Sequence, residues 1–327
     1  MDDVRNLLQS VGLSAPEFEY REVATIERWQ AAAQRWPLLG AVNRALLERS
    51  LMPPAARPPQ RNELHRAHCI AFVSLHGGSG RTTLSANLAG ALAQKGRTAL
   101  VIELDPLGGL APHFALEPED CHGAFTPAFS PLMMASWLSR FRGSGAAPVP
   151  FGRLTAGLQT GLEAACARDP NWLHKRLSAV IPEECEFAVL DLPAASHPLF
   201  RAAIASADTV ICLLSPEPAA YATLPQLEAL LDECAPRPAH YLMNGLDARR
   251  AFDRDAFASL RGTLGARVLP FAVHADPSVP LALARRRLIM QEAADSQVVA
   301  ELSRLADCVE GWAAPAGAQA PVLQAVR

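Results

Sequence analysis

Residues 69–83 read CIAFVSLHGGSGRTT, an apolar run followed by a glycine-rich turn and two threonines. The apolar run predicts a buried strand, and the Ala- and Leu-rich residues that follow the threonines predict a helix. Glycines let the turn curl so that several backbone N–H groups point at one anion, and the dipole of the helix favours the same anion. A strand, such a turn and a helix in this order predict a phosphate-binding loop.

Two positions of this loop differ from the usual phosphate-binding sequence. Arg81 stands where a lysine is usual before the first threonine, and Leu75 stands where the leading glycine is usual. Arginine is a planar fork of donors and not a compact ammonium charge. The loop therefore predicts nucleotide binding, with hydrolysis that is slow or absent. The loop residues that we expect to contact the nucleotide are His76, Gly77, Gly78, Ser79, Gly80, Arg81, Thr82 and Thr83.

Length and composition set the broad class of the protein. The chain has 327 residues, half of them hydrophobic, and a net charge of −3. This length predicts one large or two smaller domains, and the near-neutral charge gives no reason to expect nucleic acid as a partner. The seven cysteines lack metal-ligand spacing and predict reduced thiols. We see neither a signal peptide nor an apolar stretch that could span a bilayer, and expect a cytoplasmic protein.

The chain divides into four parts by composition. Residues 1–52 carry helical patterns, with a first short helix and a second that is broken at Pro37. Residues 53–65 form a proline-rich linker. Residues 66–312 form the main domain, and residues 313–327 are expected to be disordered.

The main domain alternates strand and helix patterns, which predicts an α/β fold with a mostly parallel, doubly wound sheet. Within residues 108–150 we expect loops and one helix near 132–141. The predicted strands are 68–74, 98–104, 186–191, 209–214, 239–243 and 267–271. The predicted helices are 82–95, 170–181, 219–233, 253–264 and 292–311.

Three carboxylates follow predicted strands and are candidates for chemistry. Glu103 and Asp105 are two residues apart and share one face at the end of a strand. One of them can order Mg²⁺ through water, and the other can polarise an attacking water. Asp191 ends another apolar strand, a position suited to holding Mg²⁺ through water, with Thr82 as its direct ligand.

Residues 77–109 resemble the MinD/ParA class of deviant P-loop ATPases. The resemblance implies a P-loop NTPase sheet, ATP and Mg²⁺ as cofactors, and a homodimer that sandwiches two nucleotides. It also implies that Asn244 reads the adenine edge. His76 stands where the class has a lysine that crosses to the partner's phosphates, so transition-state stabilisation between subunits should be weak.

Within that class the chain is most similar to the BcsQ (YhjQ) family of bacterial cellulose secretion. Residues 150–152, PFG, and 169–177, DPNWLHKRL, resemble segments of that family. Residues 1–47, with RWPLL at 35–39, resemble the BcsR family, so the chain is identified as a BcsR–BcsQ fusion. The resemblance implies partners at the inner membrane: the cellulose synthase, its accessory subunits and, where present, a cyclic-di-GMP-sensing subunit.

Three functions stay open at this stage. We favour an ATP-clamped dimeric scaffold of the cellulose synthase complex, recruited peripherally to the inner membrane by its partners. The alternatives are an active positioning ATPase of the MinD or ParA kind and an interaction module that binds no nucleotide. The residues that we expect to dock the N-terminal part onto the main domain are Trp36, Pro37, Leu38 and Leu39.

Overall fold

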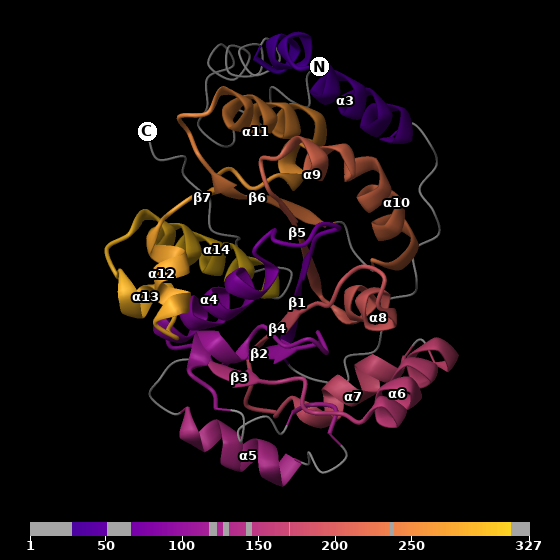
Figure 1. Cartoon of the computed structure of the whole chain (residues 1–327), viewed down its shortest axis with the longest axis vertical. Helices are drawn as coiled ribbons and strands as arrows, with labels where there is room; N and C mark the ends of the chain where they lie inside the picture. Colours follow the sequence, from indigo (N-terminus) through magenta and orange to yellow (C-terminus); the bar gives the residue numbers. More distant parts are fainter. Residues whose placement is uncertain are drawn as a thin grey trace.

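The structure is a computed structural model that describes residues 28–50, 67–117, 123–126, 131–141, 146–169, 171–235 and 239–314. The first predicted helix, the proline-rich linker and nearly all of the predicted tail lie outside these residues. The described chain forms one parallel sheet with helices on both faces, as Figure 1 shows.

The sheet has seven strands in the order β3-β2-β4-β1-β5-β6-β7. All of its pairings are parallel, and β1 lies between β4 and β5. Strands β4, β2 and β3 extend the sheet on one side of β1, and β5, β6 and β7 extend it on the other. In a sheet of this kind, a crevice forms at the carboxyl ends of the central strands. The strands are β1 His68–Val73, β2 Ala99–Glu103, β3 Ala147–Val149, β4 Phe187–Asp191, β5 Thr209–Leu214, β6 His240–Leu246 and β7 Val273–His274.

Two hydrophobic clusters form the core, one on each face of the sheet. In β1, Ile70 and Phe72 belong to one cluster while Cys69, Ala71 and Val73 belong to the other, because successive side chains point to opposite faces. Both faces of β1 are therefore covered, which explains why its residues read as a continuous apolar run.

One face of the sheet packs against α4 Arg81–Gln94, α12 Ser278–Ala284, α13 Ile289–Glu292 and α14 Gln297–Ala313. The opposite face carries α5 Pro131–Arg140, α6 Ala156–Arg168, α7 Trp172–Val180, α8 Pro198–Ser206, α9 Pro218–Ala222, α10 Leu224–Cys234 and α11 Ala251–Leu264. In Figure 1, α4 and α14 lie on one side of the central strands and α8 on the other. None of the helices in the described ranges is long and apolar enough to cross a bilayer.

The predicted strand 267–271 is wrong. Residues Gly265–Arg267 form a 3-10 turn, and only a single bridge joins Val268 to Tyr241 before the short strand β7 forms at 273–274. Pro270 interrupts this segment, and a proline has no N–H to donate to a sheet. The apolar composition of residues 267–271 therefore predicts a strand ahead of the residues that form β7.

Other elements were missed or merged. Strand β3 was missed because three residues carry no readable periodicity. Helices α6 and α8 were also missed: α6 contains two glycines, and α8 is nearly uniformly apolar. The predicted helix 219–233 is two helices that meet at Thr223, and Pro225 lies in the first turn of the second.

Residues 28–50, the described piece of the N-terminal part, are helical and pack on the main domain. One helix covers residues 28–35, and α3 covers Pro37–Ser50, so the break falls at Trp36 as the proline predicted. Helix α3 contacts α9, α10 and α11, at the edge of the main domain farthest from β3 in Figure 1. Leu39 is 0% exposed within the core cluster of that face.

Candidate functional site

The glycine-rich loop joins the end of β1 to the first residue of α4. Gly78 and Gly80 have φ angles of 74° and 87°, in the left-handed region that favours glycine. A Cβ on Gly80 would lie 2.4 Å from Nδ2 of Asn244, so any other residue at this position would require the Asn244 side chain to move. Glycine is therefore favoured at this position by its left-handed conformation and by its contact with Asn244.

The backbone donors of the loop are available to a ligand. Helix α4 begins at Arg81 with no side-chain cap, and its first intrahelical bond runs from the N–H of Leu84 to the carbonyl of Gly80. Within the described residues, no protein acceptor bonds the N–H groups from Gly77 to Thr83. Such a group of free donors at a helix N-terminus is suited to an anion.

Arg81 folds back onto the loop. Its guanidinium donates to the carbonyl of Ser74 over 2.7 Å. Burial lowers the pKa of Arg81, and the charges of Asp191 and Asp105 oppose that shift. Arg81 therefore lies near Asp191 and Asp105, and its hydrogen bond to Ser74 stabilises the start of the loop.

Asp191 and Thr82 meet at the crevice, from β4 and α4. Thr82 donates its hydroxyl to Oδ1 of Asp191 over 3.2 Å, while Oδ2 of Asp191 is buried with no hydrogen-bond partner. Burial raises the pKa of Asp191 to about 7; the bond from Thr82 lowers it, and the nearby charge of Glu103 raises it. A buried, unpartnered carboxylate oxygen beside a threonine hydroxyl fits a hydrated Mg²⁺.

Glu103 connects two loops through its carboxylate, and the catalytic role expected for it stays a prediction. Its carboxylate accepts from the N–H groups of Gly109, Leu110 and Phe151 over 2.6, 2.8 and 3.1 Å. Three backbone donors leave little capacity to activate a water. Asp105 accepts one bond, from the N–H of Leu107, and is the carboxylate with the freer side chain.

His76 bonds within its own chain. Its Nε2 lies 3.1 Å from the hydroxyl of Thr223, between α9 and α10, and its N–H donates to the hydroxyl of Ser74. The ring is therefore held against the same subunit. Ser74 and Thr223 were not singled out from the sequence, because a serine and a threonine in loops carry no pattern.

Asn244 touches the loop from β6. Its Nδ2 donates to the carbonyl of Ser79 over 2.8 Å. Its Oδ1 is then the group left to accept from an adenine amino group. Thr83 contributes its carbonyl to Nδ2 of Asn87 inside α4, so its hydroxyl is the group available to a phosphate.

A second set of predicted residues lies on the N-terminal helices. Nε1 of Trp36 donates to Asp255 over 2.8 Å, and the ring packs edge-on against Phe252 at 5.2 Å between centroids. Asn43, which was not predicted, bonds Ser259 over 2.7 Å in a buried position. Pro37 begins α3, and Leu38 is half-buried against the core. The segment thus docks on α11 of the same chain.

The run Arg285-Arg286-Arg287, which could have indicated a nucleic-acid site, is paired with acids. Arg285 and Arg287 face Glu292, and Arg286 pairs with Glu117 over 2.8 Å. The run therefore does not form an open basic face.

Comparison with solved structures gives the class of protein. The fold is similar to that of cobyrinic acid a,c-diamide synthase from Mycobacterium smegmatis with a bound ATP analogue and magnesium, at 19% identity and TM-score 0.55 over 75% of this chain and 94% of that one. It is also similar to the cell division ATPase MinD of Pyrococcus furiosus, at 18% identity and TM-score 0.53 over 75% and 98%. The fold is that of the MinD/ParA-like P-loop NTPases, as predicted.

Sequence comparison gives the family. A virulence plasmid ParA family protein, pGP5-D, of Chlamydia psittaci is 27% identical over 150 residues, which are 46% of this chain. The chain spans 57% of the length of that relative. Residues 67–309 match the family model of cellulose biosynthesis protein BcsQ, and residues 1–42 match that of cellulose biosynthesis protein BcsR-like. The chain belongs to the BcsQ family and carries a BcsR-like segment before it, which confirms the predicted fusion.

Proposed function

We propose that this chain is an ATP-clamped dimeric scaffold of the cellulose synthase complex with slow or no hydrolysis. One observation carries the proposal: the loop offers free backbone donors to a phosphate chain, while neither lysine of the deviant loop is present. ATP binding would depend on the backbone donors, whereas hydrolysis would depend on the two lysines. This site has the donors and lacks the lysines.

The residues of the site have distinct binding roles. The N–H groups of the loop and of the first turn of α4 would hold the phosphates, with the hydroxyl of Thr83. Thr82 would ligate Mg²⁺ directly and Asp191 through water, and the metal would neutralise phosphate charge when bound. Asn244 would orient the base from β6, and its bond to Ser79 couples base and phosphate recognition.

Slow turnover follows from two missing lysine ammonium groups. His76 is directed to Thr223 of its own subunit, and Arg81 is directed to the carbonyl of Ser74. By analogy with oxyanion donors, each missing preorganised charge costs on the order of 10²–10³ in rate. Asp105 would order the water, while neither lysine of the deviant loop is present to stabilise the developing charge.

Dimer formation is supported by the loop that follows β2. Leu107 is 91% exposed, two residues after Asp105 and beside the proposed nucleotide site. A single exposed apolar side chain is common on protein surfaces, so it is the position of Leu107 beside the nucleotide site that would place this loop in an ATP-dependent dimer interface. The dimer would present the N-terminal helices, docked through Trp36 and Leu39, to the synthase and its accessory subunits at the inner membrane.

The decisive experiment combines nucleotide binding, oligomeric state and phosphate release on the purified chain. We expect ATP with Mg²⁺ to convert monomer to dimer and phosphate release to be slow. The double variant His76→Lys, Arg81→Lys should raise release by on the order of 10² or more, because it supplies both lysine ammonium groups of the deviant loop. The matched control Arg44→Lys changes an exposed arginine on α3 and should leave release unchanged.

Each alternative function has its own signature in this experiment. Rapid phosphate release by the unaltered chain would overturn the clamp and favour a positioning ATPase. If the chain does not bind ATP at concentrations that saturate related phosphate-binding loops, the interaction module that binds no nucleotide is the function that remains. A dimer that forms equally with and without ATP would refute the clamp even if ATP binds.

A further inference from the structure

A second cavity, of about 440 Å³, lies between the segment after β2 and the end of α12, outside the nucleotide site. Its lining residues include no residue of the glycine-rich loop and none of the acids Glu103, Asp105 and Asp191. This volume lies within the range of small-molecule sites. The cavity is lined by His113, Phe114, Ala115, Phe141, Arg286, Arg287, Leu288 and Gln291.

The polar groups of this cavity are donors and not carboxylates. Arg287 is about half exposed, and its Nη1 lies 3.8 Å from the buried carboxylate of Glu292, so a ligand would share this guanidinium with that acid. Oε1 of Gln291 accepts from the N–H of Leu288, which leaves Nε2 of Gln291 as a donor. Both guanidinium and amide groups favour an anion, and guanidinium fits a phosphate bidentately.

His113 adds an unusual buried group. The residue is 3% exposed, yet none of the described residues forms a hydrogen bond with its ring. Burial lowers the pKa of His113 to about 4, so the ring is neutral and offers one donor and one acceptor. The residue lines the cavity, so a ligand there would meet one nitrogen of this ring.

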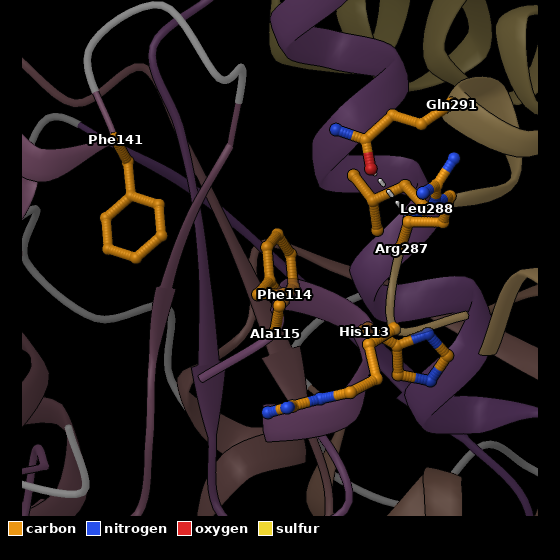
Figure 2. A pocket seen from close by; sticks show the side chains of 8 residues that line it. His113, Phe114, Ala115, Phe141, Arg287, Leu288 and Gln291 are labelled. Carbon is orange, nitrogen blue, oxygen red and sulfur yellow. Dashed lines mark hydrogen bonds between the residues drawn. The ribbon is translucent and has the colours of Figure 1, made fainter. Parts of the chain in front are cut away.

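The remaining wall is apolar and aromatic. In Figure 2, Phe114 lies between Phe141 and the group formed by Arg287, Leu288 and Gln291. Two rings and a leucine beside cationic donors suit a molecule with a planar body and an acidic end.

Each of the two walls of the cavity contains one residue with an unfavourable backbone conformation. Ala115 and Arg286 are the only non-glycine residues with positive φ in the described chain, at 52° and 56°, and both line this cavity. Arg286 also bridges the walls, since it bonds Glu117 and the carbonyl of Leu116, each over 2.8 Å. Such strain persists where surrounding contacts over-determine it, and it clusters at ligand sites.

From these observations we propose that this cavity is a second ligand site, for a small phosphate ester that carries an aromatic ring. Arg287 and Gln291 would bind the phosphate, His113 would bond the ligand from below, and Phe114 would cover the ring. The site shares no residue with the nucleotide loop, so it stands or falls independently of the ATP clamp.

The test is calorimetric titration of the full chain with phenyl phosphate, in the presence of saturating Mg²⁺ and ADP to occupy the loop. Inorganic phosphate and phenol are the two partial probes. We expect phenyl phosphate to bind about tenfold or more tightly than inorganic phosphate, because the ring buries apolar surface. Arg287→Gln should weaken phenyl phosphate by about 10- to 100-fold through the loss of charge-assisted bonds.

Two further variants keep the result interpretable. Arg44→Gln removes the same charge from exposed α3 and should leave the affinity unchanged. Phe114→Leu should weaken phenyl phosphate but not inorganic phosphate, and an unaltered urea midpoint will show that each variant is folded. The proposal is overturned if the unaltered chain does not bind phenyl phosphate, if Arg287→Gln binds it equally, or if inorganic phosphate binds as tightly.

Discussion

Gly80→Ala tests whether Asn244 and the loop act as one unit. The added Cβ would lie 2.4 Å from Nδ2 of Asn244, and the residue keeps a φ of 87°. A left-handed alanine costs about 1–2 kcal/mol. Relief of the contact requires Asn244 to move and to lose its 2.8 Å bond to the carbonyl of Ser79, which costs about 1 kcal/mol more. We therefore expect a loss of about 2–3 kcal/mol in the free energy of unfolding without nucleotide.

The second arm of this test is a double-mutant cycle. In an Asn244→Ala background the close contact is absent, so Gly80→Ala should cost only the left-handed penalty of about 1–2 kcal/mol. Urea unfolding of the four chains measures the coupling, expected at about 1 kcal/mol. Gly77→Ala is the matched control, because a Cβ there meets nothing within 4 Å, and its effect should be near zero. Equal costs of Gly80→Ala in both backgrounds would refute the reasoning.

Three further predictions address docking, pH and metal. Leu39→Ala, at a 0% exposed site on α3, should lower the free energy of unfolding by about 2–5 kcal/mol, whereas Leu47→Ala, 42% exposed on the same helix, should change it by less than about 0.5 kcal/mol in urea unfolding. Burial holds the pKa of His113 at about 4, below its ordinary 6.5, so the unfolded chain binds more protons between these values. The free energy of unfolding should thus fall on acidification through that window, by at most about 1.4 kcal/mol per pH unit. The variant His113→Gln should lack this part of the pH dependence. If the unaltered chain and the variant show the same pH dependence, the assignment to His113 is wrong. Chelation of Mg²⁺ should weaken ATP binding about tenfold or more in the unaltered chain and much less in Thr82→Val, as measured by titration; an equal loss in both would exclude Thr82 as the ligand.

Several contacts of the site could not have been predicted from sequence. The carboxylate of Glu103 looks catalytic at a strand end, but it accepts from Gly109, Leu110 and Phe151, the last of which is 48 residues away. His76 meets Thr223 across 147 residues. Nothing in the local pattern of either residue encodes such a partner, because hydrogen bonds between distant loops depend on how the elements pack.

The sequence by itself determined the class of fold and the position of the loop, since both follow from local regularities. Apolar runs of strand length, glycines at a tight turn and an Ala/Leu-rich helix are short-range patterns, and each limits the backbone within a few residues. Tertiary structure decided which side chains are free to act. It turned His76 and Arg81 onto backbone and hydroxyl groups of their own chain, left Oδ2 of Asp191 without a partner, and brought His113 and Arg287 to one cavity. The reason is physical: a buried polar group acts according to the partners that packing brings to it, and those partners are distant in sequence.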